Sequence, residues 1–585
     1  MGGHLVLLMV IGLTTCVVSD KIDDMVPKIL HRLAEVREIL APLPKEVLDE
    51  AMYHTATYYI PIDSELDVCR NHSSLLFDAF LNYEIWALKM VDASSKGGSG
   101  LLDGNIMDLG NHGQCLSARH PQGLFGGQLC AVETRGILPL DMDSLNPKRP
   151  ILPTLRIDLM FSVCVPDSCS SRDVKTHMDL ALNSVNASAI IYNSSCSSVK
   201  PLPWTRGDRV AMLVVIVILL LVTAGTWFDN SSDNTDVCWS ELLRSFSVSR
   251  NCRSLLDTSH TCNTPRCLSG LRVIAMAWMM LGYRMIHLLA CPNFRFKYLA
   301  ENIDNIAWAP VENAQLSVEI FFLITGVKVT YNYFRHCQAG RGFSNKQFLL
   351  HHYLRLTPPL ALVVLLYATV LVRVTEGPVW RRLFVFQQEF CQKHWWANLL
   401  YISNYITPYE MCIPQTWYLA VEFQMYIFSP LLLIPLYRNS RWGFFFLGVT
   451  FFASTLGGII NAYLLEIQAG GLIRMDRTRE GTNILDYFYT QYRLASFLIG
   501  IYLGYLVFKI NKGQIILKIT KVQKWAGWIV SSLLILTSVL SVSIFQDPEY
   551  VYTPWLDSTY GILHRPALSL GVGWIILACS TGNGG

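Results

Sequence analysis

Long apolar segments separated by short polar stretches fill the second two thirds of the chain. The first, Val210 to Trp227, reads VAMLVVIVILLLVTAGTW and is long enough as a helix to cross about 30 Å of hydrocarbon. Segments of this character are 210–227, 271–290, 314–331, 351–372, 416–437, 442–465, 491–508, 525–545 and 562–580. The pattern therefore predicts an all-α multi-span membrane protein with about nine transmembrane helices.

The amino terminus is apolar but shorter than a membrane span. MGGHLVLLMVIGLTTCVVSD has an apolar core from Leu5 to about Val18, followed by the small residue Ser19. This pattern is typical of a cleavable signal peptide, although no Lys or Arg precedes the core. We expect residues 1–19 to be a signal peptide, with an uncleaved anchor as the alternative.

Residues 20–209 have the polarity expected of a folded domain outside the membrane. Helical patterns such as DDMVPKILHRLAEVREIL precede Gly-rich turns around SSKGGSGLLDGN. An even number of cysteines predicts three disulfides, whose pairing the sequence leaves open. These cysteines are Cys69, Cys115, Cys130, Cys164, Cys169 and Cys196, and the glycosylation sequons begin at Asn71, Asn186 and Asn193. We predict an α-rich, disulfide-stapled lumenal or extracellular domain.

The charge of the chain fits a membrane protein and excludes a nucleic-acid partner. Of 585 residues, 52% are hydrophobic and 16% are charged, against about 25% charged residues in soluble proteins. The net charge of +3 is small for this length, and the sequence has no basic stripe of the kind that binds nucleic acid.

The orientation in the membrane follows from the distribution of Lys and Arg. The loops 332–350, 438–441 and 509–524 contain several of these residues and no Asp or Glu. Short loops of this kind lie in the cytoplasm, so the linker 228–268 is also predicted to be cytoplasmic. Arginines in outer loops, such as Arg381, make the asymmetry moderate. Cys391 and Cys412 fall in one outer loop and are candidates for a further disulfide. We expect an integral membrane protein of the endoplasmic reticulum or the plasma membrane.

Polar side chains recur near the ends of the apolar segments. Arg355 at an inner boundary can extend to lipid phosphates or hold a substrate. Glu422 lies nearly two turns inside an apolar segment and needs a buried partner or a role. Tyr283 and His287 are four residues apart and share one helical face.

The sequence resembles two known families over nearly all of its length after the first 19 residues. MVDASSKGGSGLLDGNIMDLGNHGQCLSARH and FSVCVPDSCSS resemble the cysteine-rich domain of nose-resistant-to-fluoxetine family proteins. SVEIFFLITGVKVTY, HHYLRLTPPLAL and QTWYLAVEFQMYIFSPLLL resemble the integral-membrane acyltransferase family three. The resemblance assigns 20–209 to the first domain and 269–585 to the second, with 210–227 and the linker between them. Because the chain stops directly after an apolar segment, we expect the second domain to be incomplete at its C-terminal end.

The resemblance implies transfer of an acyl group from acyl-CoA to a hydroxyl of a lipid, sterol or glycan. Acyl-CoA would be the co-substrate, and neither a permanently bound cofactor nor a metal is expected. Expected partners are the lipid bilayer and a lipid or lipophilic small molecule, while protein partners stay unknown. The candidate catalytic residues are Tyr283, His287, Glu319 and Glu422, and the candidate substrate-binding residues are His352, Arg355, Trp417 and Arg493.

The chain departs from the acyltransferase pattern at two positions. The family's first helix usually carries Gly-His, where this chain has Gly282-Tyr283, and His352 replaces the first arginine of a paired-arginine motif. A tyrosine phenol is a poor base at neutral pH, so His287, one turn away, is a candidate displaced base. One alternative is a non-catalytic relative that binds or transports lipids or lipophilic molecules. Another is a receptor-like or scaffold protein that contacts a secreted partner through its disulfide-stapled domain.

Overall fold

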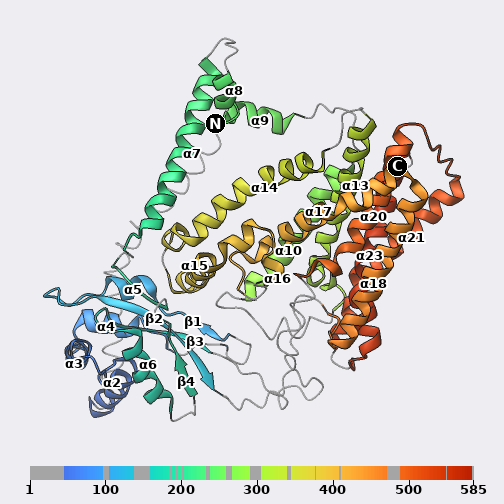
Figure 1. The fold of residues 1–585 in the computed structure, drawn as a ribbon. Helices are drawn as coiled ribbons and strands as arrows, with labels where there is room; N and C mark the ends of the chain where they lie inside the picture. Colours follow the sequence, from blue (N-terminus) through green and yellow to red (C-terminus); the bar gives the residue numbers. More distant parts are fainter. Residues whose placement is uncertain are drawn as a thin grey trace.

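The structure is a computed structural model with an N-terminal domain, a peripheral apolar helix and a helical bundle (Figure 1). It describes residues 45–96, 100, 105–136, 159–183, 187–192, 195–200, 203–231, 238–257, 267–289, 305–338, 344–375, 377–406, 410–470, 488–547 and 550–582. The predicted class, a mainly helical multi-span membrane protein with a disulfide-stapled N-terminal domain, is confirmed.

The N-terminal domain packs five helices around a small sheet that the sequence did not predict. The helices are α2 (Lys45–Tyr59), α3 (Asp67–Leu81), α4 (Ile85–Asp92), α5 (His112–Ser117) and α6 (Ser171–Leu182). The strands are β1 (Met107–Asp108), β2 (Gly127–Gly136), β3 (Met160–Pro166), β4 (Ala187–Ile190) and β5 (Cys196–Ser198). The sheet order is β1-β3-β2-β4, and β5 also pairs with β2. Because six of the seven residues of β3 are buried, that strand lacks the polar alternation that reveals a half-exposed strand.

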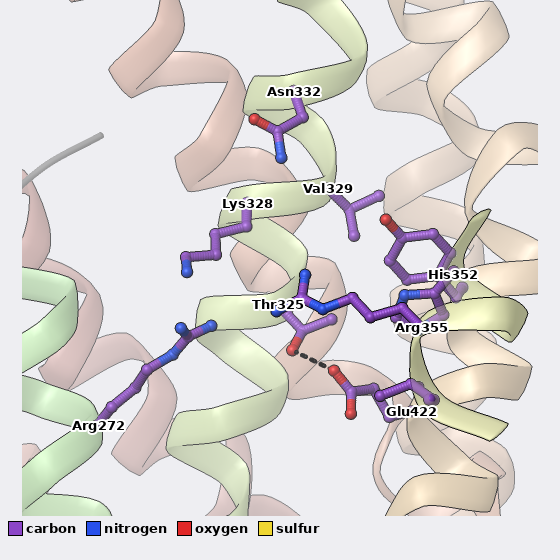
Figure 2. A pocket seen from close by; sticks show the side chains of 10 residues that line it. Arg272, Thr325, Lys328, Val329, Asn332, His352, Arg355 and Glu422 are labelled. Atoms are coloured by element: carbon purple, nitrogen blue, oxygen red, sulfur yellow. Dashed lines mark hydrogen bonds between the residues drawn. The ribbon is translucent and has the colours of Figure 1, made fainter. Parts of the chain in front are cut away.

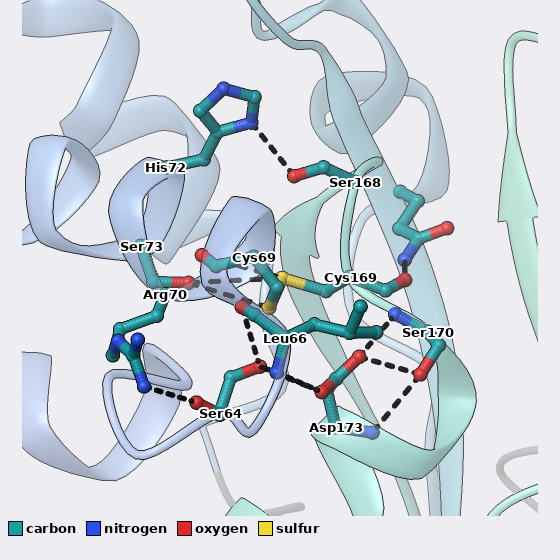
Figure 3. Close-up of a disulfide and its surroundings, with 11 residues drawn as sticks. Ser64, Leu66, Cys69, Arg70, His72, Ser73, Ser168, Cys169, Ser170 and Asp173 are labelled. Atoms are coloured by element: carbon teal, nitrogen blue, oxygen red, sulfur yellow. Dashed lines mark hydrogen bonds between the residues drawn. A yellow bond between two sulfur atoms is a disulfide. The ribbon is translucent and has the colours of Figure 1, made fainter.

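All eight predicted disulfide cysteines are paired. The bonds are Cys69–Cys169, Cys115–Cys164, Cys130–Cys196 and Cys391–Cys412. The first bond joins α3 to the segment just before α6 (Figure 3). The sequon residue Asn71 is exposed on α3, whereas Asn186 and Asn193 lie outside the described residues.

A buried carboxylate in the first turn of α6 connects this helix to the segment just before α3 (Figure 3). Asp173 accepts hydrogen bonds from Ser64 Oγ at 2.7 Å and from the Ser170 backbone at 2.9 Å, the latter as part of a capping box. Burial on its own would raise the pKa of Asp173, but the bonds donated by Ser170, Ser64 and Leu66 outweigh it and lower the pKa. The carboxylate therefore stays charged well below neutral pH and keeps the start of α6 in place.

Acidification should loosen α6 through His177. Its side chain is buried, its Nε2 lies 3.2 Å from the Tyr58 carbonyl oxygen, and its Nδ1 lies 3.9 Å from Asp63 Oδ2. Burial lowers the pKa of His177 below its ordinary value, although nearby Asp63 opposes the shift. The folded domain thus favours the neutral ring, and its stability falls as the pH drops below about 6.5, the ordinary histidine pKa. Hydrogen exchange of α6 in the full-length protein, corrected for intrinsic rates, should speed up between pH 7 and pH 5.

The variant His177→Gln is the control for this effect, because it removes the titrating group. Its α6 protection should no longer change over that pH range. An equal loss of protection in the variant and in the wild type would assign the effect to another group.

Eight of the described helical segments are long and apolar enough to cross a membrane. They are 206–231, 314–338, 345–368, 414–438, 440–464, 494–511, 521–546 and 554–580. Each overlaps one of the predicted spans. The ninth predicted span, 271–290, forms α10 (Cys267–Leu289), which carries Arg272 and Arg284 and is not among the eight.

The described part of the bundle consists of long helices and several short helical elements. The long helices are α13 (Ser317–Gln338), α14 (Asn345–Ala368), α15 (Pro378–Leu399), α17 (Trp417–Arg438), α18 (Ser440–Leu464), α20 (Leu494–Asn511), α21 (Lys521–Leu540) and α23 (Pro554–Ser580). The short elements are α12 (Ala309–Glu312), η4 (Ala314–Leu316), η5 (Val370–Arg373), α16 (Ser403–Ile406), η6 (Pro414–Thr416), η7 (Thr490–Tyr492) and α22 (Val542–Gln546).

Helix α13 is the centre of the bundle. It contacts α10, α17, α20 and α23, and most of its residues are buried. Its closest neighbour is α20, because glycines allow the two backbones to touch. A Cβ at Gly326 would lie 2.4 Å from the Phe497 carbonyl oxygen, and one at Gly500 would lie 2.3 Å from that of Leu323. Small residues permit such close packing in membranes, and this packing fixes which face of α13 points away from α20.

The N-terminal domain contacts the bundle through α15. Arg381 donates to the Cys196 carbonyl oxygen at 2.8 Å, and the Tyr192 and Phe386 rings are 5.1 Å apart. Helix α7 (Arg206–Ser231) leads from the domain to α8 (Cys238–Arg244) and α9 (Val248–Leu256). It is anchored at its first turn by an ion pair of 2.9 Å between Asp208 and Arg373. We call the face of the bundle toward this domain the N-domain side (Figure 1).

Candidate functional site

A polar cavity of about 160 Å³ opens between α10, α13, α14 and α17. Its charged lining residues are Arg272, Lys328, Arg355 and Glu422, and the others are Thr325, Val329, Asn332, His352, Leu356 and Tyr426. Figure 2 shows the three cationic side chains pointing from three helices toward one space. We call this space the cationic cavity.

Helical periodicity explains why these side chains meet. Thr325, Lys328 and Asn332 are spaced three and four residues apart and lie on one face of α13. Gly326 lies on an adjacent face of α13, and that face packs against α20. On α14, His352 and Arg355 are spaced in the same way. The ring of His352 stacks on Tyr426 of α17 with centroids 3.7 Å apart, which fixes α14 against α17.

Glu422 lines the cavity from α17 (Figure 2). Its Oε1 accepts a hydrogen bond from Thr325 Oγ1 at 3.1 Å, and the Tyr418 hydroxyl also hydrogen-bonds it. Arg272 and Arg355 are close enough to interact with its charge. The buried partner that an acid inside an apolar helix needs is therefore present.

The cavity carries an excess of positive charge. Three cations face one carboxylate among its lining residues, and Lys328 lies within electrostatic range of all three other charged groups. Cations held together in a partly enclosed space repel one another, and a polyanionic ligand would relieve that repulsion. Arg and Lys are also the side chains that bind phosphate best. The arrangement can thus bind a phosphorylated small molecule.

A second polar cluster is fully buried and separate from the cationic cavity. Arg493 Nη1 lies 2.5 Å from Glu319 Oε1, and both side chains are 0% exposed. Ser496 donates to Glu319 Oε2 at 2.6 Å. The Arg493 guanidinium lies 5.3 Å from the ring centroid of Trp417, which is 1% exposed and therefore buried in the bundle. With both carboxylate oxygens engaged, this cluster joins α13, α17 and α20.

Comparisons with known proteins agree with this architecture. Residues 266–584 match the family model described as an acyltransferase domain, and residues 69–178 match the N-terminal domain of nose resistant-to-fluoxetine protein. The chain belongs to the nose resistant-to-fluoxetine family of membrane proteins with an acyltransferase domain. The predicted resemblance is thereby confirmed.

Two relatives illustrate the range of the similarity. Nose resistant to fluoxetine protein 6 of Caenorhabditis elegans is 25% identical over 574 residues, covering 86% of this chain and 68% of its own length. A protein of Staphylococcus aureus (strain COL) named "Putative O-acetyltransferase" is 25% identical over 200 residues, covering 33% of this chain and 30% of its own length. No solved structure gives a significant match. The chain is therefore an acyltransferase-like membrane protein.

The structure divides the predicted site residues of this family member into three groups. His352, Arg355 and Glu422 line the cationic cavity, whereas the second cluster holds Glu319, Trp417 and Arg493. Tyr283 is half-buried on α10 and does not line the cavity. It lies eleven residues beyond Arg272, on the same helical face but about 16 Å farther along the axis. The side chain of His287 lies outside the described residues.

Sequence reasoning missed Arg272, the third cation of the cavity. It is the second residue of the apolar run that begins at Leu271, and a charge at that place is easily assigned to the membrane boundary. The sequence feature that could have identified Arg272 is its spacing from Tyr283. Eleven residues are about three helical turns, so both side chains lie on one face of the helix. Lys328 and Asn332 could have been found from their spacing to Thr325 on an otherwise apolar helix.

Proposed function

We propose that the chain transfers an acyl group from acyl-CoA to a hydroxyl acceptor, and that the cationic cavity binds the phosphates of the CoA. The observation that carries this proposal is the convergence of Arg272, Lys328 and Arg355 from three different helices. CoA carries a pyrophosphate and a 3′-phosphate, and its acyl group is joined to it as a thioester. A cavity with excess positive charge matches the phosphate end of such a donor.

The orientation of the bundle supports a cytoplasmic donor. Except for Thr325 near the middle of α13, the lining residues of α13 and α14 belong to the halves of these helices that lead into the loop between them, away from the N-domain side. That loop is one of the segments rich in Lys and Arg, and such loops face the cytoplasm. In this proposal the N-terminal domain faces the lumen or the cell exterior, and the acceptor is a lipid, sterol or glycan hydroxyl.

Glu422 is placed to organise the donor end of the reaction. Its side chain accepts a hydrogen bond from Thr325 and lies within electrostatic range of Arg272 and Arg355. The phosphates would replace water around those guanidinium groups, which strengthens each charge-assisted bond. The transfer also requires a base for the acceptor hydroxyl and donors for the tetrahedral oxyanion.

The proposal is tested with the purified full-length protein and acetyl-CoA labelled in the acetyl group. Octyl glucoside serves as a hydroxyl acceptor, and vesicles of phosphatidylcholine with cholesterol serve as a second source. We expect wild type to release CoA thiol and to move label into an acceptor or into acetate. Acetyl-CoA binding without any turnover would contradict the proposal and would support the non-catalytic lipid-binding alternative.

The variant Tyr283→His tests whether the natural chain lacks a base. If the wild type has a base elsewhere, restoring histidine at Tyr283 should change kcat by less than about threefold, because a second base adds little to a completed site. A wild type without turnover and a Tyr283→His variant with it would show that the natural protein is not catalytic. Thermal unfolding of both proteins checks that the fold is unchanged.

A further inference from the structure

A second cavity lies on the N-domain side of the bundle, between the starts of α13 and α23 and the end of α18. It measures about 40 Å³, and its polar lining includes Gln315, Gln468, Asp557, His564 and Arg565. A space of this size holds a few water molecules or the hydroxyl-bearing end of a larger molecule. We call it the histidine cavity.

The geometry of His564 leaves one ring nitrogen free to accept a proton. The side chain is 8% exposed, and its Nδ1 lies 2.7 Å from the Tyr560 carbonyl oxygen. A carbonyl oxygen can only accept, so Nδ1 carries the hydrogen and Nε2 carries the lone pair. The ring also stacks on Tyr560, with centroids 4.8 Å apart and planes 14° apart, which fixes its orientation. A backbone carbonyl that fixes the tautomer in this way is a common feature of histidine bases.

Other polar groups of the cavity suit an acyl transfer. Arg565, 5% exposed, lines the same cavity and donates to the Tyr492 carbonyl oxygen at 3.4 Å. A guanidinium in the cavity would stabilise a developing oxyanion. Gln315 offers an amide that can hold an acceptor hydroxyl. Asp557 is a weaker candidate for the base, because its two carboxylate oxygens accept hydrogen bonds from Ala469 N at 2.9 Å and from the Tyr550 hydroxyl at 2.6 Å.

The histidine cavity adjoins the part of α10 that carries Tyr283. A Cβ at Gly282 would lie 2.4 Å from Cβ of Ala314, the residue directly before Gln315. Along η4 and α13, Gln315 and Thr325 of the cationic cavity are ten residues apart, or about 15 Å. The flexible pantetheine arm between the CoA phosphates and the thioester is suited to a distance of this order.

We propose that His564 is the general base that takes the proton from the acceptor hydroxyl. This inference rests on the proposed function. His564 Nε2 would accept the hydroxyl proton as the acceptor oxygen forms its bond to the thioester carbonyl carbon. When the carbon–sulfur bond of the tetrahedral intermediate breaks, the electron pair leaves with sulfur, and the imidazolium returns the proton to the CoA thiolate.

The variant His564→Asn is the sharpest test, because the asparagine amide can still donate to the Tyr560 carbonyl while the base is gone. With labelled acetyl-CoA and octyl glucoside, we expect kcat to fall about 100-fold or more. The dissociation constant for acetyl-CoA should stay within twofold of the wild-type value. The matched control His336→Asn, at an exposed position on the last turn of α13, should leave both quantities unchanged.

The outcomes separate this inference from the proposed function. If wild type turns over and His564→Asn keeps kcat within threefold, His564 is not the base, although the acyltransferase function stands. If wild type binds acetyl-CoA without turnover, the proposed function itself fails. Should His564→Asn unfold at a lower temperature, His564→Ala with added imidazole decides the matter. Concentration-dependent rescue of turnover supports a base, and an absence of rescue overturns the proposal.

Discussion

Replacing Lys328 with methionine and Arg355 with glutamine should together weaken the binding of acetyl-CoA about 100-fold. Both side chains line the cationic cavity and come from different helices. A hydrogen bond to a charged group contributes about 1.5–3 kcal/mol, and Arg355 should supply the smaller part because it is exposed to water, which screens its charge. Titration calorimetry of the full-length protein at low and at physiological salt measures the effect. Higher salt should reduce the difference between the two proteins.

A matched variant distinguishes this site from general electrostatic attraction. Arg335→Gln with Lys346→Met removes the same charge from exposed positions at the neighbouring ends of α13 and α14, which do not line the cavity. It should change the dissociation constant by less than threefold. Equal weakening by both double variants would mean that the basic loops attract the ligand and that the cavity does not bind it.

Replacing Glu319 with glutamine should destabilise the bundle by about 3–5 kcal/mol. The carboxylate and the Arg493 guanidinium are both fully buried, so the substitution leaves a buried charge without its counterion. Ser496 would also lose a charged acceptor. The free energy of unfolding of the purified protein, from denaturant or thermal melts in detergent, should fall by this amount. Such a loss would identify Glu319 as a structural residue of the bundle.

The double variant Glu319→Gln with Arg493→Met tests the physical cause. Removing both charges removes the desolvation cost that the single variant leaves behind, so the double variant should be more stable than Glu319→Gln alone. A single variant as stable as the wild type would show that the pair contributes little. A double variant less stable than either single change would assign the loss to packing.

The membrane spans were predictable because hydrocarbon allows few alternatives to a long apolar helix. The segment Val210 to Trp227, for example, has the length and composition of a membrane-spanning helix, and it forms most of α7. The sheet of the N-terminal domain was not predictable in the same way. Strand β3 is buried almost throughout, and a short apolar run without alternation does not distinguish a strand from a buried helix.

Some residues of the site were predictable from the sequence, but their arrangement was not. His352, Arg355 and Glu422 stood out because polar groups inside apolar segments need a reason. Which of them meet depends on how α13 rotates against α20, and that rotation is set by the contacts of Gly326 and Gly500. Nothing in local periodicity separates Glu319 from Glu422, yet the first pairs with Arg493 and the second lines the cavity.

The most direct test of the cationic cavity as the acyl-CoA site is photolabelling of the full-length protein. Acetyl-CoA with a photoreactive azide on its adenine is bound and irradiated, and the labelled peptides are then identified by mass spectrometry. We expect label in α10, α13 or α14 near Arg272, Asn332 or Arg355, and we expect excess acetyl-CoA to prevent this labelling. Label confined to other helices, or label that excess acetyl-CoA does not reduce, would contradict the cationic cavity as the acyl-CoA site.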